Sequence, residues 1–89
     1  MTYNYELLEN GLRSIVARYK GQLKAEYLKD VTDFIDVGEY GEAFDLLCSV
    51  IRNAQQRVPG DVYEMLTTLG REMQLDEKLW TGLLPRKNE

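Results

Sequence analysis

Two apolar patterns of helical period meet at Gly38 within residues 27–51, which read YLKDVTDFIDVGEYGEAFDLLCSVI. In each pattern apolar side chains recur three or four positions apart, which is the spacing of one buried helix face. A glycine between two such patterns ends a helix, because it adopts the left-handed backbone conformation at low cost. We therefore predict a helix that ends near Val37 and another from about Tyr40 to Gln56. The second is the most apolar segment of the chain, so we expect it to be central.

The same period continues upstream of this helix pair. Apolar residues predict a first helix from about Tyr3 to Lys20, which Gly21 is placed to end. Gly11 lies inside this helix, where glycine costs about 1 kcal/mol relative to alanine. We take Gly11 to mark a close crossing with another helix.

Downstream, the Val-Pro-Gly sequence at residues 58–60 is the clearest break in the chain. Asp61 is then expected to be an N-cap, with Glu64 three residues later completing a capping box. A fourth helix follows, and Asp76 is a candidate cap for a short last helix that carries Trp80.

The chain contains no run of β-branched residues with strand alternation and no hairpin turn signal. We predict an all-α fold, a compact bundle of four amphipathic helices plus a short C-terminal helix. Residues 1–85 would form a single helical domain, because the chain is too short for two. Residues 86–89 are expected to be a frayed tail.

Composition narrows the classes of partner. The 89 residues carry a net charge of −4, with 29% charged and 44% hydrophobic residues, which is typical of a globular domain. An acidic surface suits neither nucleic acid nor an anionic membrane, so we expect no nucleic-acid and no membrane partner. With no secretory signal and a single cysteine, a cytoplasmic location is expected.

Residues for catalysis and metal binding are scarce. The chain has no histidine, and Cys48 lies in an apolar helix, where we expect a buried and inert thiol. Asp30, Asp33 and Asp36 do not match the spacing of a calcium loop. We therefore expect no enzyme activity, no cofactor and no metal site.

One surface has a single sign of charge. From residue 30 to residue 51 there are six acidic residues and no basic one. We call these six residues the acidic band: Asp30, Asp33, Asp36, Glu39, Glu42 and Asp45. The band is interpreted either as a solvated helix face or as a surface for a positively charged partner. Helix dipole and capping effects partly explain Asp36, Glu39 and Glu42, but not the other three.

The aromatic residues allow similar alternatives. Tyr40 lies between two glutamates, so it is either a half-buried tyrosine or an interface anchor. Tyr19 and Tyr27 are expected to be half-buried with their hydroxyls at the surface. Trp80 is expected to seal the core rather than to contact a partner.

Residues 33–48, DFIDVGEYGEAFDLLC, resemble the signature of the MafI-type immunity proteins. These are small helical proteins encoded beside the polymorphic or contact-dependent growth inhibition toxins of Gram-negative bacteria. A helix around Tyr63 and the later sequence LDEKLW at residues 75–80 fit as well, so the resemblance covers about residues 28–83.

The resemblance implies an immunity protein, or antitoxin, that binds and neutralises the C-terminal effector domain of a cognate toxin, a basic nuclease, as a 1:1 heterodimer. Such a nuclease inhibitor would act by protein–protein interaction and cover a basic active-site or substrate-binding surface. The partner-binding residues are then expected to be Asp33, Asp36, Glu39, Tyr40, Glu42 and Asp45.

Several alternatives remain open at this point. The protein could plug the toxin's active site or clamp a neighbouring surface, and the acidic turn favours the plug. The basic residues Arg13, Arg18, Lys20 and Lys24 either bind an acidic part of the partner or are only solvated. The alternative function is that of a small helical scaffold or adaptor with a protein-binding groove.

Overall fold

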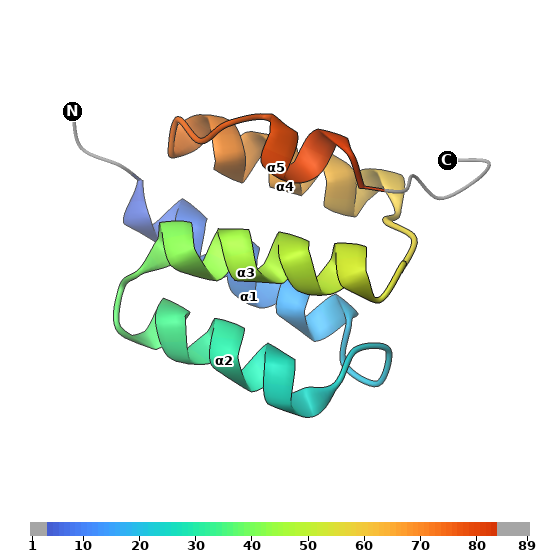
Figure 1. Cartoon of the computed structure of the whole chain (residues 1–89). Coiled ribbons are helices and arrows are strands. Elements are labelled where there is room, and N and C mark those ends of the chain that lie inside the picture. Colours follow the sequence, from blue (N-terminus) through green and yellow to red (C-terminus); the bar gives the residue numbers. More distant parts are fainter. Residues whose placement is uncertain (1–3, 84–89) are drawn as a thin grey trace.

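The computed structural model describes residues 4–83, and it confirms the all-α prediction (Figure 1). Four helices of 12 to 14 residues are followed by one short helix. Their bounds are α1 (Tyr5–Arg18), α2 (Ala25–Asp36), α3 (Tyr40–Asn53), α4 (Gly60–Glu72) and α5 (Lys78–Thr81). No strand occurs in residues 4–83, where the only β-type pairing is an isolated bridge between Lys20 and Leu23.

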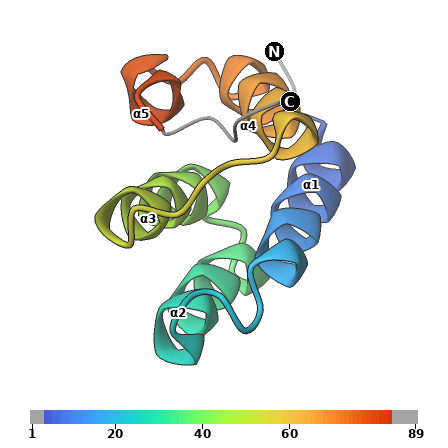
Figure 2. The same cartoon turned by 90° about the vertical axis from the view of Figure 1, so that its right-hand side faces the viewer.

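The helices lie in three tiers. Figure 2 shows α1 and α3 in the middle, with α2 on one side and α4 and α5 on the other. Helices α1, α2 and α3 contact one another, whereas α4 packs on α1 and α5 packs on both α3 and α4. The helix end predicted from Gly38 is confirmed, and α2 and α3 run antiparallel on either side of the short turn (Figure 1).

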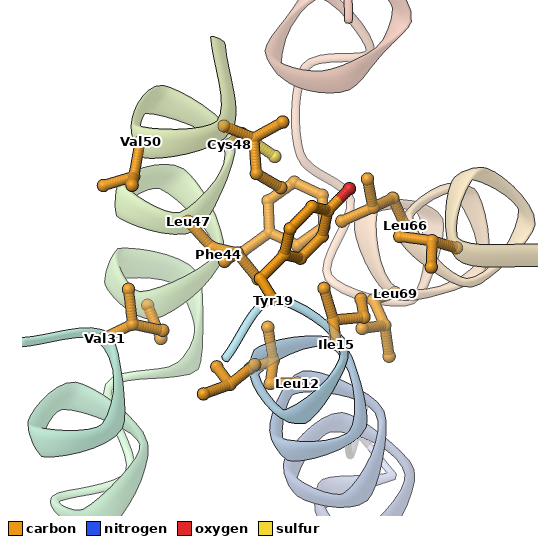
Figure 3. Close-up of a cluster of buried hydrophobic side chains, with 14 of the residues drawn as sticks. Leu12, Ile15, Tyr19, Val31, Phe44, Leu47, Cys48, Val50, Leu66 and Leu69 are labelled. Carbon is orange, nitrogen blue, oxygen red and sulfur yellow. The ribbon is translucent and has the colours of Figure 1, made fainter. Parts of the chain in front are cut away.

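Helix α3 is central, as its composition predicted. It contributes more buried residues than any other helix, namely Ala43, Phe44, Leu47, Cys48, Val50 and Ile51. Figure 3 shows several of these side chains meeting Leu12 and Ile15 of α1 and Leu66 and Leu69 of α4. Each fully buried Leu, Ile, Val or Phe side chain contributes about 1.5–3 kcal/mol through burial. Among residues 4–83 no polar or charged residue is buried, so apolar packing holds the bundle together.

Two glycines lie where helices approach closely. A Cβ atom on Gly11 would lie 2.8 Å from Cδ2 of Leu69, so α1 and α4 cross closely there, as predicted. A Cβ atom on Gly70 of α4 would overlap the indole ring of Trp80. Glycine therefore permits the packing of α5 on α4.

The starts of two helices differ from the predictions. The capping box at Asp61 and Glu64 is wrong, because α4 begins at Gly60 with Pro59 as its N-cap. Proline fits this place since it has no N–H to leave unpaired. Asp61 instead lies in the first turn, where its carboxylate accepts a hydrogen bond of 2.6 Å from Arg18. For α5 the N-cap is Glu77, yet Asp76 accepts a 2.9 Å bond from the Lys78 amide, which is a capping contact.

The other helix ends are close to their predicted positions. Helix α1 begins at Tyr5, where the side chain of Asn4 accepts a 3.0 Å bond from the Leu7 amide. Helix α3 ends at Asn53 rather than near Gln56, because Gln55 has a left-handed backbone with φ of 54°. The predicted tail at residues 86–89 lies outside the described residues. Within residues 4–83, no helix combines the length and apolarity that a bilayer crossing requires.

Candidate functional site

The acidic band lies on the α2–α3 helix pair. Asp30, Asp33 and Asp36 belong to α2, Glu42 and Asp45 belong to α3, and Glu39 precedes α3 directly. All six residues are exposed. The sequence therefore predicted the exposure of the band correctly, but contacts within the molecule divide it into two groups.

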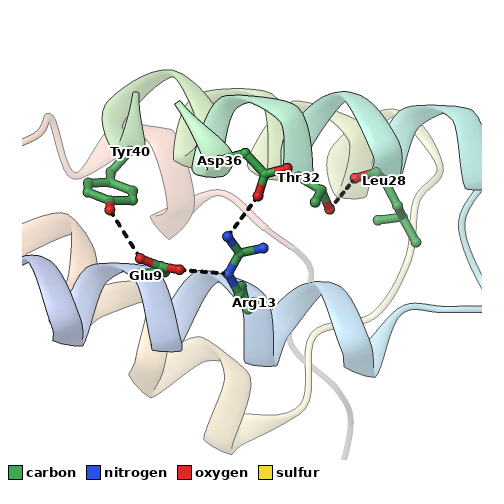
Figure 4. Close-up of polar contacts among 6 residues, drawn as sticks. All are labelled: Glu9, Arg13, Leu28, Thr32, Asp36 and Tyr40. Atoms are coloured by element: carbon green, nitrogen blue, oxygen red, sulfur yellow. Dashed lines mark hydrogen bonds and ion pairs between the residues drawn. The ribbon is translucent and has the colours of Figure 1, made fainter. Parts of the chain in front are cut away.

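Asp36 is held by an arginine from the first helix. Its carboxylate accepts a 2.8 Å hydrogen bond from Arg13, and Arg13 also donates a 3.0 Å bond to Glu9 (Figure 4). The bond to Asp36, followed by that to Glu9, raises the pKa of the Arg13 guanidinium above its ordinary value. Arg13 thus links α1 to the end of α2, and the charge of Asp36 is partly compensated.

Asp33 is compensated within its own helix. It accepts a 2.9 Å hydrogen bond from Lys29, which lies one turn earlier on α2. This bond raises the pKa of the Lys29 ammonium group. Asp33 and Asp36 are therefore the two predicted partner-binding acids that already have a cation beside them.

The other four carboxylates differ in this respect. Among residues 4–83, Asp30, Glu39, Glu42 and Asp45 have no ion-pair partner within 4.0 Å. We call these four residues the open carboxylates. They place uncompensated negative charge on α3, at the turn before it and in the middle of α2.

Tyr40 packs against α1 rather than projecting freely. Its side chain is half-buried, its ring centroid lies 6.0 Å from that of Tyr5, and its hydroxyl lies 3.4 Å from Oε1 of Glu9 (Figure 4). Desolvation and the Glu9 carboxylate raise the pKa of the Tyr40 phenol. Only part of this side chain is accessible to a partner, and its role as an anchor stays a prediction.

The burial predicted from the sequence is correct for Cys48 and Trp80 but not for Tyr19. Cys48 is buried as predicted, and burial raises the pKa of its thiol to about 12. Trp80 seals the core as predicted, since it is 1% exposed, contacts Phe44 edge-on and donates a 3.0 Å bond to Thr67. Tyr19 was predicted to be half-buried, which is wrong. It is fully buried because its hydroxyl donates to the Arg57 carbonyl at 3.2 Å and needs no water.

A groove between α2 and α3 was not predicted as a site. It has a volume of about 480 Å³ and lies between the start of α2 and the end of α3. Tyr27 and Leu46 line it, and both lie at the edge of their helix's apolar stripe. The sequence signal that could have indicated this groove is an apolar residue at the edge of a helix's apolar stripe, because the residues at the centre of the stripe pack in the core.

Within residues 4–83 no group of three or more Cys, Asp or Glu side chains is arranged to hold a metal ion. The arrangement of the site is therefore that of a charged, partly apolar surface on two packed helices. Negative charge on such a surface attracts a macromolecule of opposite charge and speeds its encounter.

No family model matches this chain, and comparisons with curated proteins and with solved structures find no similar protein either. Membership of the MafI-type immunity proteins accordingly stays a prediction from the sequence motif.

Proposed function

We propose that this protein is an immunity protein that binds a basic toxin effector domain and neutralises it. The observation that carries the proposal is the group of four open carboxylates, which are exposed and have no ion-pair partner in the described part of the chain. Like charges one turn apart on a helix destabilise it by a few tenths of a kcal/mol per pair. A basic partner would convert this internal repulsion into attraction across an interface.

A nuclease fits this charge pattern as the target. Nucleases bind the phosphates of nucleic acid with lysine and arginine side chains, and carboxylates compete for the same cations. Charge complementarity of this kind raises the association rate and selects the partner. Neutralisation follows when the bound protein prevents the nucleic acid from reaching the basic surface.

Direct blocking of the active site and binding beside it give different kinetics. A plug competes with all substrates, whereas a protein bound nearby blocks long nucleic acids more strongly than dinucleotides. Inhibition measured with both substrate lengths therefore separates the two geometries.

The experiment that tests the proposal begins with capture of the partner from the native locus and a nuclease assay on the captured protein. Glu42→Lys is then compared with Glu64→Lys, since both residues are exposed and both changes add two positive charges. We expect Glu42→Lys to weaken binding at least tenfold and to reduce its salt dependence, and Glu64→Lys to change the Kd less than twofold. Equal effects of the two changes would contradict the proposal.

The second candidate is a helical adaptor, which the groove between α2 and α3 favours. An adaptor would bind its partner without abolishing an enzymatic activity of that partner. The same capture experiment separates the two functions, because only an immunity protein must restore growth to cells that express the captured partner.

A further inference from the structure

We infer that the partner inserts a basic amphipathic helix lengthwise into the groove between α2 and α3. The inference rests on the proposed function only in taking the partner to be a positively charged protein. It adds the surface that is used and the secondary structure that is recognised.

The groove has a mainly apolar lining. Its volume is about 480 Å³, and its lining includes Leu23, Tyr27, Leu46, Val50 and Ala54. Tyr27 is 43% exposed, and it is one of only three large hydrophobic side chains exposed among residues 4–83. Exposed apolar surface between polar rims is typical of an interaction site.

The apolar surface continues along the helix pair beyond the groove. Phe34 lies two turns after Tyr27 on α2 and is half-buried, as is Leu46 on α3. Helices α2 and α3 lie side by side (Figures 1 and 2), and Tyr27 and Leu46 line the same groove between them. Phe34 lies on the same face of α2 as Tyr27, so we take it to extend the apolar floor of the groove. Helices of 12 and 14 residues are about 18–21 Å long, which matches a partner helix of three to four turns.

Carboxylates flank this floor on both helices. Asp30 lies one turn from both Tyr27 and Phe34 on α2, and Glu42 and Asp45 lie one turn before Leu46 and Ser49 on α3. All three carboxylates belong to the open carboxylates defined above. An apolar floor with two acidic rims is complementary to a helix with one apolar stripe and Lys or Arg on both flanks.

This charge distribution selects one occupant. A second copy of the chain that used the same face would bring identical carboxylates together, and like charges across an interface oppose association. A basic helix instead pairs each rim with a cation and covers the apolar floor. We therefore assign the groove to a partner helix and not to self-association.

One end of the groove has the opposite charge. Nζ of Lys24 lies 5.7 Å from the ring centroid of Tyr27, at the start of α2. The bound helix would place its basic residues beside Asp30, Glu42 and Asp45, and none beside Lys24. This arrangement determines which end of the bound helix lacks basic residues.

A pair of model peptides tests the inference. Both have about 15 residues with leucine at every third or fourth position; one carries Lys and Arg on its flanks, and the other carries Glu there. Titrated into the full-length ¹⁵N-labelled chain, the basic peptide is expected to shift the amide signals of Tyr27, Leu46, Ser49 and Asn53. We expect the acidic peptide to bind at least tenfold more weakly. Shifts confined to the α2–α3 turn, no shifts, or equal binding of both peptides would overturn the inference.

Matched variants locate the contact. Tyr27→Ala removes an exposed ring from the groove, and Ser49→Trp fills the groove. Tyr5→Ala, the matched control, removes an exposed ring from α1. The two groove changes are expected to weaken binding of the basic peptide at least tenfold, and Tyr5→Ala less than twofold. Circular dichroism melts verify that each variant is folded. Loss with Tyr5→Ala alone would place the contact near Tyr40 and overturn the inference.

The two proposals fail in different ways. If the captured toxin is lost by Glu42→Lys but retained by Tyr27→Ala and Ser49→Trp, the acidic surface binds and the groove inference is wrong. If the peptide occupies the groove but the native locus yields no toxin, the immunity proposal is wrong and the groove inference stands. Concentration-dependent shifts of the groove residues without peptide would identify a second copy as the occupant and overturn the inference.

Discussion

At the scale of single residues, the packing of α5 depends on the missing side chain of Gly70. The indole of Trp80 lies where a Cβ atom on Gly70 would be, and the same ring contacts Phe44 edge-on at 5.6 Å between centroids. Trp80 thus joins α4 to α3 through one aromatic group. Because Gly70 contacts this ring with its backbone, it cannot move away from Trp80 without shifting the whole of α4.

Gly70→Ala should therefore destabilise the protein. Overpacking of this kind costs about 1–3 kcal/mol, although alanine is the better helix former. Gly41→Ala is the matched control, because Gly41 also lies in a helix and a Cβ atom there would meet nothing within 4 Å. The control should raise the free energy of unfolding by up to about 1 kcal/mol. Urea unfolding measures both, and equal changes in the two variants would contradict the packing argument.

At the scale of elements, three helices end in the same hydrogen-bonded motif. In each, an amide bonds the carbonyl five residues earlier, and the residue before that amide has a left-handed backbone. The bonds are Glu39 to Phe34 at 2.9 Å, Gln56 to Ile51 at 3.1 Å and Leu75 to Gly70 at 2.9 Å. Glycine occupies the left-handed position after α2, but glutamine occupies it after α3 and α4.

Glycine at these two glutamines should stabilise the protein. Gln55 and Gln74 have φ of 54° and 57°, a conformation that costs a residue with a Cβ atom about 1 kcal/mol or more. We expect Gln55→Gly and Gln74→Gly each to raise the free energy of unfolding by about 0.5–1 kcal/mol, after the larger entropy of unfolded glycine is subtracted. Gln56→Gly is the control and should lower stability. Thermal unfolding followed by circular dichroism distinguishes these signs.

The helix ends also show what the sequence could predict. Apolar periodicity located every helix, and Gly38 located the turn, because both signals are local. The two glutamines carry no local signal for a left-handed backbone, so the end of α3 was predicted three residues late. Tyr19 was misjudged for a similar reason, since its hydroxyl partner is the carbonyl of Arg57, 38 positions away.

For the candidate site too, some features could be predicted from the sequence and others are visible only in the folded chain. Exposure of the acidic band follows from helical spacing, which the sequence contains. Pairing of Asp36 with Arg13 joins residues 23 positions apart, so only the folded chain shows which carboxylates remain open. The groove also requires α2 and α3 to be placed side by side before Tyr27 and Leu46 share a surface.

At the scale of the whole molecule, charge is separated along α2. The α1–α2 connection follows Arg18 and contains Lys20 and Lys24, whereas the α2–α3 turn contains Glu39 and follows Asp36. These two connections lie at opposite ends of the molecule (Figure 1). Such a distribution orients a charged partner before contact and accelerates association.

Removal of one open carboxylate should therefore change stability and association in opposite directions. Asp45 lies one turn after Glu42 and has no ion-pair partner among the described residues, so Asp45→Asn should raise the free energy of unfolding by a few tenths of a kcal/mol. The same change should slow association with the basic model peptide at low salt, while the dissociation rate changes little.

The matched control for this prediction is Asp61→Asn, which removes the same charge from the ion pair with Arg18. The hydrogen bond from Arg18 is the main cause that lowers the pKa of the Asp61 carboxyl. The ion pair therefore stabilises the fold above the unfolded pKa, which is near 3.8, and this stabilisation is lost as the pH falls through the lowered pKa. Asp61→Asn should accordingly lower the melting temperature at pH 7 and leave peptide association unchanged. Stopped-flow rates and melting curves at two salt concentrations measure both quantities. A lower melting temperature for Asp45→Asn would contradict the repulsion argument, and slower association for Asp61→Asn alone would show that the α2–α3 face does not steer the peptide.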